Sequence, residues 1–111
     1  MATPKCIFCS IAKHEIPSDI IFENDDFLAI KDIHPEAPTH VLIIPKTHFE
    51  KLTDVPEAER SLYAGLFSTA VDVAKKLGIE SACRFSVNNG AGAGQIVPHI
   101  HVHLLSHERQ V

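Results

Sequence analysis

Three histidines alternate with apolar residues near the C-terminus, in the segment HIHVHLL. Successive side chains of a β-strand point to opposite faces, and neighbours on one face lie about 6.6–6.8 Å apart. We therefore expect His99, His101 and His103 to line one face, while the apolar residues between them face the core. Such a row of imidazoles can bind a metal ion or supply a nucleophile. A plain solvent-facing strand would more often carry Lys, Glu or Thr.

Two cysteines near the N-terminus have the spacing of structural zinc ligands. Cys6 and Cys9 form a C-x-x-C pair, and His48 and His99 could complete a tetrahedral site. Such a site would tie the N-terminal segment to a small domain. The competing interpretation is a thiol pair that binds nothing. A third alternative, a hydrolase in which all three C-terminal histidines bind one ion, also stays open at this point.

A glycine-rich loop, NNGAGAGQ, precedes the histidines. Its glycines leave backbone N–H groups able to turn toward an anion, and Asn88 and Gln95 place side-chain amides at its two ends. No G-K-[ST] follows, so this is not a Walker loop. A phosphate beside a row of histidines predicts phosphoryl or nucleotidyl transfer, whereas the alternative is a flexible turn.

The helices and strands that the sequence predicts around these residues indicate an α+β fold. A short helix is expected within residues 6–15. Strands are expected at 20–23, 27–33, 40–46, 84–89 and 99–105. These five strands with one long helix inserted late imply a mostly antiparallel five-stranded sheet, with the long helix on one face.

The long helix is predicted between residues 54 and 78. Asp54 is the expected N-cap, Pro56 is tolerated in the first turn, and Gly78 is expected at the C-terminal end. Apolar residues at three- and four-residue intervals form its buried stripe, namely Leu62, Leu66, Ala70, Val73 and Leu77.

Composition limits the function classes. The chain has 111 residues, 45% of them hydrophobic and 22% charged, and we expect one domain over residues 1–111. The net charge of −4 gives no basic surface for phosphate groups, so we expect no nucleic-acid partner. No apolar run has the length of a membrane span, and the segment MATPKC lacks a secretory signal, so we expect a cytoplasmic protein. Three cysteines argue against a disulfide framework.

The segment HIHVHLL has the pattern H-φ-H-φ-H-φ-φ and resembles the signature of the histidine triad (HIT) superfamily. The resemblance extends over CIFCSIAKHEIPSDIIFENDDFLAIKDIHPEAPTHVLIIPKTH and FSVNNGAGAGQIVPHIHVHLL, which are similar to the Hint-like branch and its bacterial zinc-containing members. It implies a single HIT domain with the HIT-like fold, a homodimer formed through the long helix and a sheet edge, and a purine nucleotide as substrate.

The resemblance also implies a role for each matching residue. His101 matches the nucleophile, which attacks the α-phosphorus and forms a nucleotidyl-histidine intermediate; His103 matches the third triad member, and His40 a relay or orienting partner. The phosphate positions are Asn88, Gly94 and Gln95, and the ribose position is Asp32. The apolar purine pocket is Phe8, Ile11, Ile16, Ile30 and Ile33. The structural zinc ligands are Cys6, Cys9, His48 and His99.

The resulting hypothesis is an adenosine 5′-monophosphoramidase-like hydrolase. It would cleave purine nucleoside phosphoramidates, acyl-adenylates or dinucleoside polyphosphates. The alternative is a non-catalytic nucleotide-binding regulatory protein. Ile96 stands where many members carry Ser or Thr, which leaves the leaving-group preference open. His14, His34 and His107 are expected to be loop residues without a chemical role.

Overall fold

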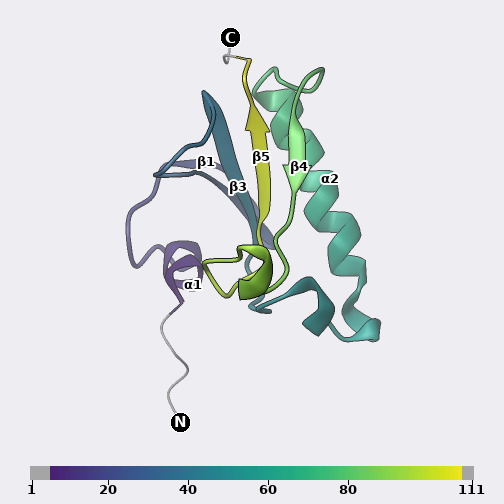
Figure 1. Cartoon of the computed structure of the whole chain (residues 1–111). Helices are drawn as coiled ribbons and strands as arrows, with labels where there is room; N and C mark the ends of the chain where they lie inside the picture. Colours follow the sequence, from purple (N-terminus) through teal and green to yellow (C-terminus); the bar gives the residue numbers. More distant parts are fainter. Residues whose placement is uncertain (1–5, 109–111) are drawn as a thin grey trace.

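An antiparallel sheet of five strands organises the computed structural model, which describes residues 6–108 (Figure 1). In chain order the elements are α1 (Ile7–Ala12), β1 (Ile20–Glu23), β2 (Phe27–Lys31), β3 (Thr39–Pro45), α2 (Ser61–Lys76), β4 (Arg84–Ser86) and β5 (Val102–Ser106). Single 3-10 turns lie at Leu52–Asp54, Glu57–Glu59 and Ala91–Ala93. The strand order is β1-β2-β3-β5-β4, and every neighbouring pair is antiparallel. The α+β fold with one long and one short helix is therefore confirmed.

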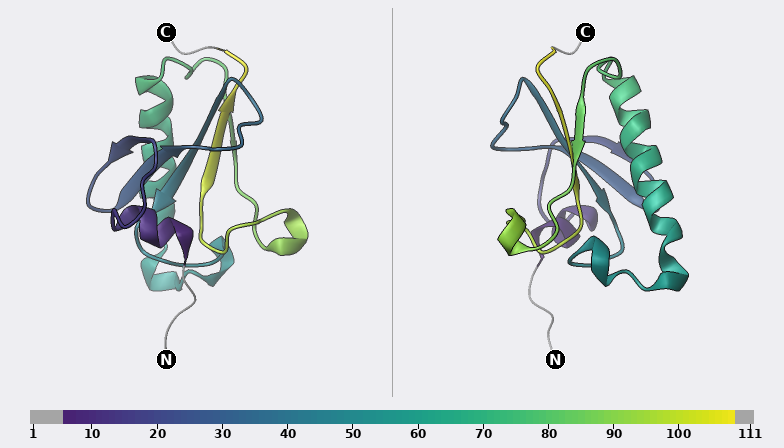
Figure 2. Two further views of the ribbon diagram at one scale, coloured as in Figure 1. Left: turned by 90° about the vertical axis from the view of Figure 1, so that its left-hand side faces the viewer. Right: turned by 45° about the vertical axis from the view of Figure 1, so that its right-hand side comes forward.

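The central strand β3 is buried along its whole length, as its nearly continuous apolar sequence predicts. Its side chains alternate between two cores. Val41 and Ile43 belong to the cluster beneath α2, and Leu42 and Ile44 belong to a second cluster that includes Phe8 of α1. Figure 2 shows the resulting layers, with α2 on one side of the sheet and α1 on the other.

The long helix begins later than predicted, at Ser61 rather than after Asp54. Pro56 disfavours the helical region for the preceding residue, and Val55 is indeed extended, with φ −73° and ψ 122°. Two short 3-10 turns replace the expected first helical turns, so Asp54 is not the N-cap. The predicted end is correct, because Gly78 follows the helix with φ 72°.

None of the helices within residues 6–108 has the length and apolar character of a membrane span.

The last strand is shorter than predicted. β5 begins at Val102, so His99 and His101 lie in the segment before it and only His103 lies within it. The alternation nevertheless persists, because the three apolar residues Ile100, Val102 and Leu104 all pack in the cluster beneath α2. The predicted strand 84–89 is also shorter, since β4 covers only Arg84–Ser86 at the sheet edge.

Candidate active site and metal centre

Four sulfur and nitrogen atoms converge from three segments of the chain. Cys6 and Cys9 come from α1 and the residue before it, His48 follows β3, and His99 precedes β5. The four ligand atoms all lie within 4.8 Å of one another. His99 Nδ1 is 3.4 Å from Cys6 Sγ, 3.6 Å from Cys9 Sγ and 2.9 Å from His48 Nδ1, and Cys9 Sγ is 3.3 Å from His48 Nδ1.

This geometry fits a tetrahedral zinc ion. Zn–S bonds of about 2.3 Å and Zn–N bonds of about 2.0–2.1 Å put neighbouring ligand atoms roughly 3.3–3.8 Å apart. The three sulfur–nitrogen distances fall in this range, whereas the two histidine nitrogens, 2.9 Å apart, would have to separate slightly around an ion. The Nε2–H of His99 donates to the carbonyl oxygen of Pro45 at 2.7 Å, which leaves the Nδ1 lone pair directed at the cluster. Burial lowers the pKa of His99 to about 4, so its ring is neutral and able to bind a metal at neutral pH. All three cysteines are free thiols.

The burial of His99 predicts how the metal-free protein responds to acid. Between pH 6.5 and about 4 the unfolded chain binds a proton at His99 that the folded protein excludes. The free energy of unfolding should therefore fall as the pH drops through this range, by about 3 kcal/mol from this residue. Urea unfolding at several pH values checks this, with His99→Gln as control. An equally steep loss of stability in both proteins would contradict it.

His101 is held as a neutral imidazole with one nitrogen available. Its ring is buried, and its Nδ1–H donates to the backbone carbonyl of His99 at 2.8 Å. The lone pair is therefore on Nε2. Burial lowers the pKa of His101 below its ordinary value, which keeps the ring unprotonated at neutral pH. These are the two requirements for a nucleophilic histidine.

His103 lies in a hydrogen-bonded chain with His40. His40 Nδ1 accepts the backbone N–H of Glu36 at 3.1 Å, so its Nε2 carries the proton. That Nε2 is 3.0 Å from His103 Nδ1 and 3.3 Å from Asp32 Oδ2. When His40 donates to His103 Nδ1, the proton of neutral His103 is on Nε2, which makes it a donor toward a ligand. Burial is the main cause that lowers the pKa of His103.

The three histidines do not converge on one ion. His99 belongs to the cysteine cluster, whereas His103 forms a separate group with Asp32 and His40. Within residues 6–108, His101 belongs to neither group of candidate ligands. The alternative of a hydrolase with one ion bound by all three rings is therefore wrong.

The glycine-rich loop differs from its prediction. Its N–H groups are largely used within the loop, since those of Ala93, Gly94 and Gln95 donate to the carbonyls of Gly90 and Ala91. The Gln95 side chain also accepts the Gly90 N–H at 2.7 Å and donates to the carbonyls of Glu50 and Val97. The expectation of free N–H groups and a free Gln95 amide is wrong, because these groups shape the loop. Positive φ angles at Gly90 and Gly94 permit this tight conformation.

The five apolar residues predicted for a purine pocket come from α1, β2 and the segments after them. Phe8, Ile11 and Ile30 are buried. Ile16 and Ile33 are 37% and 81% exposed, so these two offer most of the apolar surface that a ligand could cover. α1 and the loop between β2 and β3 lie on the face of the sheet opposite α2 (Figure 2).

Three groups that define the site were missed from the sequence. The carbonyls of Pro45 and His99 and the N–H of Glu36 fix the histidine tautomers, and as backbone groups they have no residue-type signal. The contact of Asp32 with His40 was also missed. The hairpin register could have revealed it, because the Asp32 N–H donates to the His40 carbonyl at 3.0 Å.

Comparison with known proteins gives one family and several similar chains. The family model described as HIT domain matches residues 13–110, a range that leaves out Cys6 and Cys9. The 14 kDa zinc-binding protein of Zea mays is 45% identical over 102 residues, which cover 89% of this chain and 79% of that protein. A HIT family hydrolase from Legionella pneumophila Philadelphia 1 has a TM-score of 0.89 at 42% identity, covering 95% of both chains. A histidine triad nucleotide-binding protein from Candida albicans has a TM-score of 0.82 at 36% identity, covering 90% of this chain and 73% of that one.

Proposed function

The chain belongs to the HIT domain family, and on that premise we propose that it is a nucleotide hydrolase in which His101 attacks the α-phosphorus of a purine nucleotide. Its substrates are purine nucleoside phosphoramidates, acyl-adenylates or dinucleoside polyphosphates. The observation that carries the proposal is the bond from the His101 Nδ1–H to the His99 carbonyl, which leaves Nε2 as the attacking atom.

The reaction has two steps. The bound anionic phosphate favours a second ring proton on His103. The Nε2 lone pair of His101 forms a bond to phosphorus, the bond from phosphorus to the leaving nitrogen or oxygen breaks, and protonated His103 passes its Nε2–H to the leaving group and becomes neutral. Water then attacks the nucleotidyl-histidine, its proton passes to His103, and His101 leaves with its lone pair restored. His40 holds the His103 ring through the contact between His40 Nε2 and His103 Nδ1, and the Asp32 carboxylate beside His40 favours the positive charge that this histidine pair carries before the leaving group is protonated.

The binding site surrounds these histidines. We assign the phosphate to the loop of Asn88, Gly94 and Gln95, where Gln95 acts by shaping the backbone rather than by donating its amide. Asp32 receives the ribose hydroxyls, and Ile16 and Ile33 cover the purine above a floor of Phe8, Ile11 and Ile30. Ile96 is 91% exposed in the same loop, without the hydroxyl that Ser or Thr would offer a leaving group.

Zinc and a second copy of the chain complete the proposal. The zinc ion would be held by Cys6, Cys9, His48 and His99, where it supplies a structural link between α1 and the sheet. A homodimer is supported by exposed apolar side chains on α2 and on the edge strand β4, namely Phe67, Val71 and Phe85.

The function is tested by turnover of an adenosine 5′-phosphoramidate. We expect release of the amine and AMP in equal amounts without added Mg²⁺, because histidines rather than a metal perform the chemistry. Isothermal titration calorimetry measures the affinity for AMP in the same preparation. Binding of AMP with no amine release from any of the three substrate classes would contradict the proposal and favour a nucleotide-binding regulatory protein.

A further inference from the structure

The cluster of Cys6, Cys9, His48 and His99 adjoins the proposed nucleophile His101, because the carbonyl of His99 accepts a hydrogen bond from the His101 ring. We propose that this cluster and α1 position His101 for attack, and that Phe8 is the positioning residue that carries this effect. The inference rests on the proposed function, because it assigns a positioning role to a centre that would otherwise only stabilise the fold. Two separate contacts carry it.

The first contact runs through the backbone of His99. Its ring is held on both sides, with Nδ1 at the cluster and Nε2–H bonded to Pro45. The carbonyl of the same residue accepts the Nδ1–H of His101 at 2.8 Å. The neighbouring backbone is also held, since the His99 N–H donates to Val97 and the Ile100 N–H donates to Phe49. Fixing the His99 ring therefore fixes the acceptor that selects the His101 tautomer.

The second contact runs through Phe8, which lies between the two cysteines on α1. Its ring meets the rings of both His99 and His101 edge-on, with centroids 5.8 Å and 5.1 Å apart and interplanar angles of 80° and 78°. Only 5% of Phe8 is exposed, so most of its surface serves packing rather than a ligand. Because Cys6 and Cys9 flank it, their binding to a metal fixes the position of this ring against His101.

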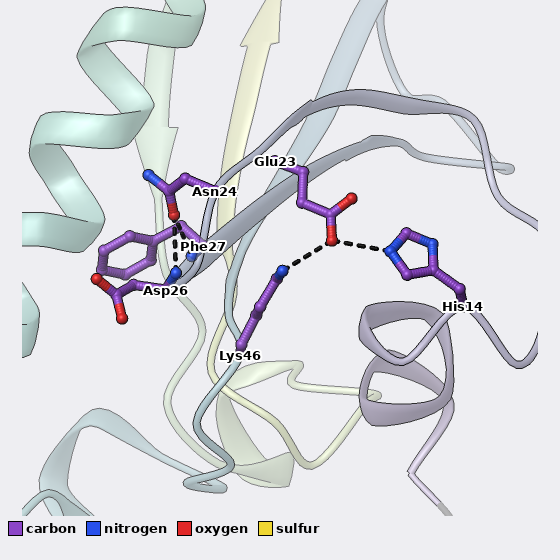
Figure 3. A network of polar contacts seen from close by, with 6 residues as sticks. All are labelled: His14, Glu23, Asn24, Asp26, Phe27 and Lys46. Carbon is purple, nitrogen blue, oxygen red and sulfur yellow. Dashed lines mark hydrogen bonds and ion pairs between the residues drawn. The ribbon is translucent and has the colours of Figure 1, made fainter.

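A polar network holds the C-terminal end of α1 to the end of β1 and to the residue after β3 (Figure 3). Glu23 accepts hydrogen bonds from His14 Nε2–H at 2.9 Å and from Lys46 Nζ at 2.7 Å. His14 follows α1, and Lys46 lies between β3 and His48. His14 lies in the turn after α1, as predicted for a loop residue, and its contact with Glu23 also attaches that end of α1 to β1.

Phe8→Met tests the positioning role, with Leu28→Met as the matched control. Both residues are buried in the same apolar cluster, and Phe8 is the one whose aromatic ring meets the ring of His101. We expect Phe8→Met to retain about one zinc per chain while kcat falls about tenfold, in addition to whatever loss of AMP affinity follows from changing the floor of the purine pocket. Leu28→Met should keep the wild-type kcat. Equal kcat in the two variants, or a loss of AMP affinity with kcat unchanged, would overturn the proposal.

A second readout needs no turnover. Nitrogen-15 NMR of the His101 ring should show the single Nδ1–H tautomer in the zinc-loaded protein, and averaging of the two tautomers after zinc is removed, with circular dichroism confirming that the sheet remains folded. An unchanged single tautomer in the folded metal-free protein would overturn the proposal. Because this measurement does not involve substrate, a wild-type protein without hydrolase activity would refute the proposed function and leave the positioning effect separately measurable.

Discussion

His101→Ala is expected to abolish phosphoramidate turnover, with a loss in kcat on the order of 10⁴-fold or more. The variant lacks the Nε2 lone pair that forms the bond to phosphorus, and no other described ring is placed to replace it. His99 is directed at the cysteine cluster, and His103 is engaged by His40. AMP should still bind with nearly unchanged affinity, because the nucleophile contributes little to holding the product.

The measurement is steady-state release of amine, together with calorimetric titration of AMP. His107→Ala is the control, since His107 is exposed and lies outside both histidine groups. We expect full activity in this control. Turnover retained in His101→Ala would refute the assignment of the nucleophile.

Cys9→Ser is expected to release the zinc ion and to lower the free energy of unfolding by about 3–5 kcal/mol. Structural zinc binding contributes directly to folding energy, and here it links α1 to segments after β3 and before β5. The effect is smaller than in a zinc finger, because the two apolar cores on either side of the sheet remain. For a domain of this size the melting temperature should fall by more than about 10 °C.

Cys83→Ser provides the matched control for this prediction. Cys83 is the third free cysteine, is partly buried against the main core and lies outside the metal cluster. Its variant should keep one zinc per chain and lose no more than about 1–2 kcal/mol. Thermal melts and metal analysis distinguish the two variants. A wild-type protein that melts at the same temperature with and without zinc would count against the structural role.

The period of the apolar residues predicted most of the fold. Alternation places Leu42 and Ile44 opposite Val41 and Ile43, and the stripe along α2 places Leu66 in the main core. The predicted start of α2 was wrong, because Pro56 disfavours the helical backbone conformation at Val55 and this restriction outweighed the capping preference of Asp54. Local chain geometry decided that boundary, and the apolar period contains no information about it.

The candidate site was predicted by residue type but not by contact. The C-x-x-C spacing and the alternating histidines identified two clusters that the structure indeed keeps separate. The backbone carbonyls that set the tautomers of His99 and His101 depend on tertiary packing, so no side-chain pattern predicts them. For the same reason, Gln95 was expected to donate to a ligand, although its amide is used by the Glu50 and Val97 carbonyls.

The covalent step is tested most directly by stopping the turnover of an adenosine phosphoramidate without acid, which would break a phosphorus–nitrogen bond. Peptide mass spectrometry then locates any modified histidine. The account predicts an adenylyl group bound through a phosphorus–nitrogen bond to the imidazole of His101, and its disappearance as AMP accumulates. An adenylyl group on His99 or His103, or steady amine release with no modified histidine at any time after mixing, would contradict it.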